Sequence, residues 1–288
     1  MRCRAIVAWH GARIERVSCP QCALHIWLSR RVFRYFDAEG GLVTLQKRSL
    51  LWKDARSFND PFEFKPRIAG TTDELQLYLS SFKEGLPLSD KTAIESIPSL
   101  NPDALSNLQA KVFDVMGEAV NTSLAETYRL LCASLVNDSI LMWSHYGGKH
   151  EGIVIEFDTD KLTKGLKYRS VIEPVNYRTN RALLSLNRLV ISESLEAFMW
   201  ESLTTKSIHW SYEEEIRIFL NSDSFSGMDP LALPFDPACV ERIILGAGSR
   251  KRTQELVKQL MGEKDYAHTK VQMARIHSSE YRLIVTDC

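Results

Sequence analysis

The chain has 288 residues, of which 44% are hydrophobic, 25% charged and 9% aromatic, and this is an ordinary globular composition. Lys and Arg total 36 and Asp and Glu total 36, so the formal net charge is zero. Proteins that bind nucleic acid mainly by neutralising phosphates carry a basic excess. The charge balance therefore argues against a non-specific nucleic-acid binder, but it leaves a nucleic-acid substrate open.

Six cysteines stand at positions 3, 19, 22, 132, 239 and 288, and this spread is too thin for a disulfide framework in a chain of this size. The sequence contains no apolar stretch near the roughly 18 residues that cross a bilayer. We therefore expect a cytoplasmic protein without a membrane segment.

Residues 1–31 differ from the rest of the chain because they carry six arginines against one acid, Glu15. Cys19 and Cys22 form one Cys-x-x-Cys pair, whereas a structural zinc site needs four ligands. We predict a basic N-terminal extension over 1–31 and one α+β domain over 32–288.

From residue 32 onward, hydrophobic patterning predicts alternating strands and helices. Strands are expected where β-branched and aromatic residues cluster, at 32–36, 50–52, 130–135, 152–157, 175–177, 212–220, 240–245, 271–276 and 281–285. Helices are expected at 42–51, 138–146, 182–203 and 253–261, with a mainly helical insertion at about 72–130. Glu39-Gly40-Gly41 is expected to form a turn. This mixture favours the α+β class.

The segment 206–219 carries the densest charge pattern. If 212–220 is a strand, Glu213, Glu215 and Arg217 share one face, because side chains alternate along a strand. A buried trio of this kind would pair Arg217 with one carboxylate and leave the other available. A solvated strand face is the alternative, and the flanking Trp210 and Phe219 favour a cleft instead.

Two further segments contain side chains suited to ligand binding. Ser144, His145 and Tyr146 place a hydroxyl, an imidazole and a phenol together, a combination that can anchor a flat ring. The His145–His150 spacing does not suit a metal on a helix, so no metal site is predicted. Asn59 and Asp60 can hydrogen-bond their own backbone in a turn.

The motifs Phe-Arg-Tyr-Phe at 33–36, Phe-Asn-Asp-Pro-Phe-Glu at 58–63, Met-Trp-Ser-His-Tyr-Gly at 142–147 and Trp-Ser-Tyr-Glu-Glu-Glu-Ile-Arg at 210–217 occur in this order. Together with Gly-Ile-Val-Ile-Glu-Phe at 152–157, they resemble the bacterial DUF2971 family over about 32–285. The resemblance implies a divergent ADP-ribosyltransferase-like fold, with a split β-sheet core and helical insertions. It also implies a relation to phage-resistance and toxin systems.

Such proteins hold NAD in a cleft between two small sheets, so the resemblance implies roles for matched positions. The implied catalytic carboxylate is Glu215, with Glu213 as the close alternative. The implied cofactor-binding residues are Arg34, Tyr35, Asn59, Asp60, Ser144, His145, Tyr146 and Arg217. For Asn59 and Asp60 a purely structural turn is an equal alternative, and Lys206 is expected either to meet a pyrophosphate or to be solvated.

The resulting hypothesis is transfer of ADP-ribose from NAD to a macromolecule, either protein or nucleic acid. Cleavage of the glycosidic bond builds positive charge on the ribose, and a neighbouring carboxylate stabilises that charge. Two other hypotheses stay open: a nucleotide-binding sensor without turnover, and a structural or antitoxin-like interaction protein.

Overall fold

The computed structural model describes residues 30–81, 87–186, 192–221, 225 and 228–288. Its described residues form two compact units, each assembled from segments that are distant in sequence. Unit 1 draws on Met1–Arg48, Ser134–Gly165 and Phe235–Cys288, and unit 2 on Ser49–Ala133 and Leu166–Pro234. The expected extension over 1–31 lies outside the described residues except at its last two positions.

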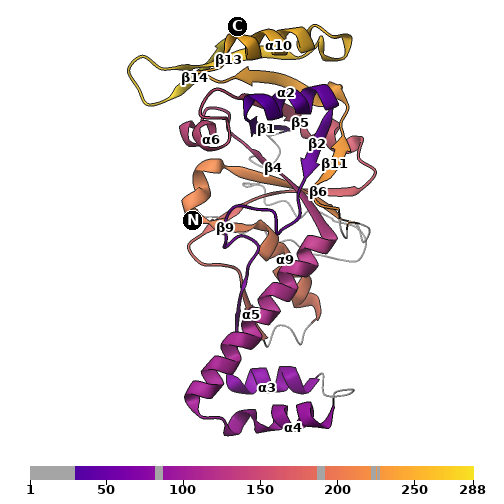
Figure 1. Ribbon diagram of the computed structural model, residues 1–288, viewed down its shortest axis with the longest axis vertical. Coiled ribbons are helices and arrows are strands. Elements are labelled where there is room, and N and C mark those ends of the chain that lie inside the picture. The colour runs from indigo at the N-terminus through magenta and orange to yellow at the C-terminus, as the bar shows by residue number, and fades with distance from the viewer. Residues whose placement is uncertain (1–29, 82–86, 187–191, 222–224, 226–227) are drawn as a thin grey trace, which may run out of the picture. The chain divides into compact units, whose positions relative to one another are not determined.

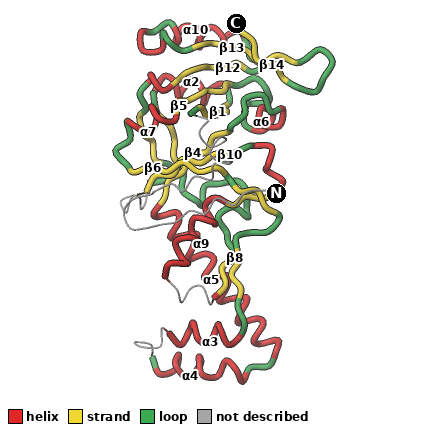
Figure 2. The backbone as a smooth tube through the Cα atoms, turned by 180° about the vertical axis from the view of Figure 1, so that it is seen from behind, coloured by secondary structure: helices red, strands yellow, loops and turns green. Residues whose placement is uncertain are grey.

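Unit 1 is built on a mixed sheet with the strand order β14-β13-β12-β5-β1, in which β12 and β13 run parallel and the other pairs antiparallel. Its strands are β1 (Arg31–Phe36), β5 (Ile153–Asp158), β12 (Val240–Leu245), β13 (Lys270–Ile276) and β14 (Leu283–Asp287). Its helices are α2 (Ala38–Lys47), α6 (Ile140–His145), α7 (Thr159–Lys164) and α10 (Lys251–Met261), with 3₁₀ helices η3 (Pro237–Cys239) and η4 (Lys264–Tyr266). Figures 1 and 2 show these elements from opposite sides.

Helix α2 lies close to the sheet of unit 1, because it contains a glycine where it meets β5. A Cβ added at Gly41 would stand 2.9 Å from the Cβ of Ile153. The Asp37 side chain accepts a hydrogen bond from the Gly40 N–H and caps this helix. The turn predicted at Glu39-Gly40-Gly41 is therefore wrong, because these residues lie in the first turn of α2. The close packing of the α2 backbone against β5 explains the glycine at position 41.

Unit 2 contains the strand order β4-β10-β6 and three separate strand pairs, β11-β2, β3-β8 and β7-β9. Its strands are β2 (Ser49–Trp52), β3 (Arg67–Ala69), β4 (Tyr128–Ser134, ending at the first residue of a unit 1 segment), β6 (Arg169–Pro174), β7 (Asn176–Arg178), β8 (Leu183–Ser185), β9 (Thr205–Ser207), β10 (Glu215–Asn221) and β11 (Leu231–Pro234). Its helices are α3 (Thr72–Ser81), α4 (Leu88–Ser96), α5 (Pro102–Thr127) and α9 (Ser192–Thr204), with 3₁₀ helices η1 (Ile97–Ser99) and η2 (Ile208–Glu213).

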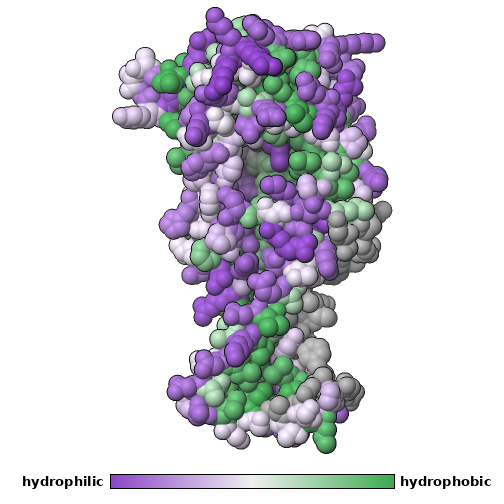
Figure 3. Space-filling model, viewed as in Figure 1, coloured by the Kyte–Doolittle hydropathy of each residue, from purple (hydrophilic) through white to green (hydrophobic). Residues whose placement is uncertain are grey.

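The helices α3, α4 and α5 confirm the mainly helical structure expected at about 72–130. Asn101 caps α5 by accepting a hydrogen bond from the Ala104 N–H, and Pro102 occupies the first turn, where its missing N–H costs nothing. Leu75 of α3 is buried in a core with Ile68 and Leu184. Figure 3 shows apolar surface over this helical part of unit 2.

Strands and helices in both units confirm the α+β class, but two further predictions are wrong. The helix expected over 182–203 is wrong at its start, because Leu183–Ser185 form β8, with Leu184 buried; helical structure is described at Leu186 and over Ser192–Thr204. The strand expected over 212–220 starts at Glu215, because 208–213 forms η2. Among the described residues, no helix is both long and apolar enough to span a membrane.

Candidate functional site

The residues predicted for the site divide between the two units. Unit 1 carries Arg34, Tyr35, Ser144, His145 and Tyr146, and unit 2 carries Asn59, Asp60, Glu213, Glu215 and Arg217. The contacts of each group are therefore described within its own unit.

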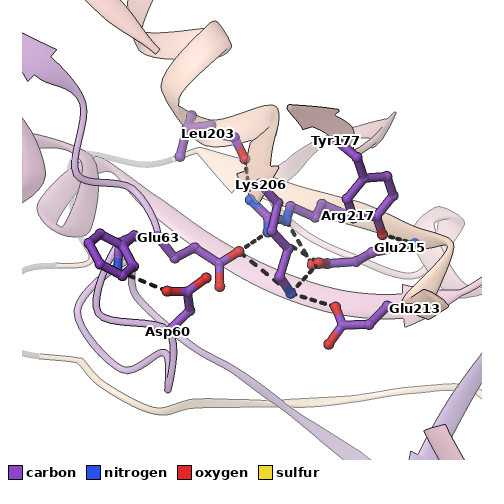
Figure 4. Close-up of polar contacts among 9 residues, drawn as sticks. Asp60, Glu63, Tyr177, Leu203, Lys206, Glu213, Glu215 and Arg217 are labelled. Carbon is purple, nitrogen blue, oxygen red and sulfur yellow. Dashed lines mark hydrogen bonds and ion pairs between the residues drawn. The ribbon is translucent and has the colours of Figure 1, made fainter. Parts of the chain in front are cut away.

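In unit 2 the predicted acids belong to a buried ion-pair cluster, which we define as Glu63, Lys206, Glu213, Glu215 and Arg217 (Figure 4). No side chain of the cluster is more than 6% exposed. The alternative of a solvated strand face is therefore wrong, and so is the expectation that Lys206 is solvated.

The local backbone explains why Glu213 and Glu215 point to the same cation. Glu213 is the last residue of η2, and Glu214 follows in the left-handed region with a φ of 41°. This turn connects directly to β10, which begins at Glu215. The predicted shared strand face is wrong for Glu213, which lies outside β10. The two acids nevertheless contact the same ammonium, that of Lys206, because of the 3₁₀ helix and the tight turn.

Lys206 binds both of these carboxylates. Its Nζ lies 2.5 Å from Oε2 of Glu213 and 2.8 Å from Oε2 of Glu215. The same ammonium lies 5.2 Å from the ring centroid of Trp210, within cation–π range. The expectation that one carboxylate would be left without a cation is therefore wrong, because Lys206 adds a second positive charge that the strand pattern did not include.

Arg217 is fully buried and uses its guanidinium as a fork. Its Nε donates to Oε1 of Glu215 at 2.7 Å, and its Nη1 donates to the Leu203 carbonyl oxygen at 2.5 Å. Its Nη2 donates to Oε1 of Glu63. The planar guanidinium also lies 4.7 Å from the ring centroid of Phe64. Arg217 thus connects β10 to the turn that contains Glu63, a geometry that a lysine could not reproduce.

Glu63 is a member of the cluster that the sequence analysis did not nominate. The turn that positions it is the predicted one: Asp60 Oδ1 accepts from the Phe62 N–H at 2.9 Å, and the Glu63 N–H donates to the Asp60 carbonyl at 3.2 Å. Asp60 is buried and Asn59 exposed. The only sequence signal for Glu63 is its position as the last residue of the motif at 58–63.

Burial and charge act in opposite directions on the acids. Burial favours the neutral form of Glu215, but the charges of Arg217 and Lys206 overcome it and lower its pKa to about 2. For Glu63, burial wins over the attraction of Arg217, and its pKa is raised. Among the described residues, Oε2 of Glu63 has no hydrogen-bond partner. Glu63 is therefore better able than Glu215 to carry a proton.

Tyr177 links the cluster to the adjoining strand pair β7-β9. Its hydroxyl oxygen accepts a hydrogen bond from the backbone N–H of Glu215 at 2.8 Å. Burial raises the pKa of Tyr177, and the negative charges of Glu215 and Glu213 add to that effect. The Tyr177 hydroxyl group therefore stays neutral while it accepts the hydrogen bond from Glu215, the first residue of β10.

In unit 1 the early-strand candidates contact their own unit. The Tyr35 hydroxyl donates to the Val136 carbonyl at 2.9 Å, and the Tyr35 ring meets that of Trp143 edge to face at 5.4 Å. The Arg34 guanidinium lies 5.4 Å from the ring centroid of Phe36. These contacts hold β1 in place, and a contact of either residue with NAD stays a prediction.

The segment after α6 brings Ser144 to His150 rather than to His145. Ser144 Oγ donates to the Ile140 carbonyl at 2.9 Å and lies 3.0 Å from Nε2 of His150. Because the hydroxyl proton is used toward Ile140, the bond to His150 requires that Nε2–H be the donor. His145 is exposed and lies beside Tyr146. Within the described ranges, His, Cys, Asp and Glu form no group of three or more that could hold a metal ion.

Comparison with known proteins yields one family. Residues 142–218 match the model of DUF2971, described as a protein of unknown function. Neither a curated protein nor a solved structure matches the chain. The matched stretch contains the motifs at 142–147, 152–157 and 210–217 and thus most of the cluster. Over this part of its length, the chain is similar to the DUF2971 family, as its motifs predicted.

Proposed function

We propose that the chain transfers ADP-ribose from NAD to a macromolecular acceptor, in the setting of phage defence or a toxin system. The observation that carries the proposal is the cluster of three carboxylates around two cations. With all five groups ionised, the cluster holds a net charge of −1 in a buried environment, where charge acts more strongly than in water. That charge suits a reaction whose transition state is positive.

In this reaction the bond between the ribose C1 and the nicotinamide nitrogen breaks, and nicotinamide leaves with the bonding electron pair. The ribose becomes oxocarbenium-like, and an acceptor nucleophile then forms a bond to C1 and releases its proton to water. A carboxylate beside the ribose lowers the barrier by stabilising the positive charge. No further oxidant or reductant is needed.

Of the two acids, the geometry favours Glu213 for this role, although the motif comparison placed Glu215 first. Both acids are buried, but Glu215 contacts two cations, so two ion pairs hold its carboxylate in place. Glu213 contacts Lys206, whose ammonium sits on a flexible four-carbon stem that a ligand could displace. We therefore assign Glu213 to the ribose and Glu215 to holding the cluster together.

A purely structural cluster is the competing proposal, and the complete burial of Arg217 and Glu63 favours it. In that case the ion pairs specify the packing of β10 on the turn at 58–64, and the protein acts as a binding or interaction module. This alternative predicts that changes in the cluster alter stability only.

The test uses the full chain, NAD labelled in its adenylate portion, and cell extract as the source of acceptor. Label should appear on protein or nucleic acid, and Glu213→Gln should remove at least 90% of it, the order expected for loss of about 1.4 kcal/mol of transition-state stabilisation. Glu214→Gln, one residue away and exposed, is the matched control and should keep its activity. Absence of label with the parent chain, or full activity of folded Glu213→Gln, would refute the assignment.

A further inference from the structure

A hollow in unit 2 lies outside the residues that the proposed function uses. It has a volume of about 620 Å³, within the range of roughly 300–1,000 Å³ usual for ligand sites. Tyr177 lines the hollow and also contacts the ion-pair cluster, because its hydroxyl oxygen accepts a hydrogen bond from the Glu215 N–H. The other lining residues come from the end of β7 and the segment that follows it, from the start of β8, from α9 and from the start of η2.

Part of the lining of the hollow is basic. Arg178 and Arg181 line it together with a single acid, Glu201. Nη1 of Arg178 lies 2.5 Å from Oε1 of Glu201, so this pair is close to neutral. Arg181 forms no ion pair with any residue that the structure describes, and its guanidinium lies 5.9 Å from the ring centroid of Phe62. The hollow therefore carries one uncompensated positive charge, on a planar group suited to two parallel hydrogen bonds with a phosphate.

Other residues that line the hollow are apolar. Leu183 and Ile208 are among them and are 46% and 41% exposed, so their side chains are accessible to a ligand. The aromatic residue Tyr177 is also part of the lining. An inorganic anion would leave these apolar side chains in contact with water, so a matching ligand needs an organic part as well as an anionic group.

We infer that this hollow binds a nucleoside phosphate, with the phosphate at Arg181 and Arg178 and the base against Tyr177, Leu183 and Ile208. A planar base covers aromatic and aliphatic surface, and its edges can hydrogen-bond to polar lining groups such as Asn180. The inference stands apart from the proposed reaction, because it concerns binding and uses none of the cluster acids.

The experiment is calorimetric titration of the full chain with AMP, ribose 5-phosphate and adenosine in low salt. AMP should bind at least tenfold more tightly than either part alone, since it engages both the basic and the apolar residues of the lining. Arg181→Gln should weaken AMP about tenfold or more and leave adenosine unchanged, as expected for loss of a charge-assisted hydrogen bond. Ile208→Asp should weaken AMP and adenosine together.

Arg252→Gln, at an exposed arginine of α10 in unit 1, is the matched control and should bind AMP as the parent does. Equal affinities for AMP and adenosine, or no effect of Arg181→Gln in a folded protein, would overturn the inference. AMP binding that depends on Arg181 without any transfer from NAD would keep the inference and reject the proposed function. Transfer from NAD with no Arg181-dependent binding would do the reverse.

Discussion

Replacing Glu215 by glutamine tests whether this residue anchors the cluster. The substitution Glu215→Gln keeps the shape of the side chain but leaves Arg217 and Lys206 buried with one negative charge fewer. A folded-state pKa of about 2, against an ordinary value of 4.5, corresponds to about 3 kcal/mol of stability at neutral pH. Removal of one partner from a buried ion pair typically costs about 3–5 kcal/mol, so both routes predict the same magnitude.

The sign of the pH dependence follows from the direction of the shift. Because the pKa of Glu215 is lowered on folding, its contribution is present above pH 4.5 and is lost as the pH falls toward 2. The difference in stability between the parent and Glu215→Gln should therefore be largest near neutral pH and shrink in acid.

Urea unfolding followed by circular dichroism measures the change in free energy, and thermal melting checks it independently. At roughly 2–4 °C per kcal/mol, the melting temperature should fall by about 6–12 °C. Glu214→Gln is the control at the neighbouring exposed acid and should change the free energy of unfolding by less than about 0.5 kcal/mol. A Glu215→Gln chain as stable as the parent at pH 7 would refute the electrostatic account of the cluster.

Two further substitutions give contrasting outcomes. Glu63→Gln keeps an oxygen acceptor for Arg217 and removes an acid whose pKa is raised by burial. The free energy of unfolding at pH 7 should therefore rise, and this gain should vanish below pH 4.5. A clear loss of stability would contradict this expectation. Gly152→Ala should destabilise by more than about 3 kcal/mol, because its Cβ would stand 2.0 Å from the Phe36 carbonyl oxygen, whereas Gly165→Ala has open space and should be neutral by thermal melting.

Local patterns in the sequence predicted most elements but not the contacts that connect them. The apolar run at 153–155 identified β5, since a short continuous run of β-branched residues is typical of a strand that is buried on both faces. The short continuous apolar run at 182–184 fits a helix or a strand equally well over so few residues. The residues of β8 form a strand because they pair with β3, which lies more than a hundred residues earlier in the chain.

The same limit applies to the candidate site. Glu213, Glu215 and Arg217 could be grouped from their spacing, because they lie within five residues of each other. Glu63 could not, because its contact with Arg217 joins residues 154 positions apart and depends on the turn that Asp60 stabilises. The sequence shows that Lys206 carries a charge, but its burial depends on the short strand β9 and on η2. No local pattern predicted either of these elements.

The protonation state of Glu63 decides how the cluster should be understood. With Glu63 neutral, two carboxylates face two cations, and the cluster is a closed electrostatic unit that needs no ligand. With Glu63 ionised, one negative charge is left over beside Lys206, and a positive transition state would be stabilised there. Burial raises the pKa of Glu63 and so favours its neutral form, and the ion pairs of Glu215 with both cations do not involve Glu63. A structural anchor and a reactive carboxylate are therefore compatible in one cluster, provided that Glu215 performs the first role and Glu213 the second.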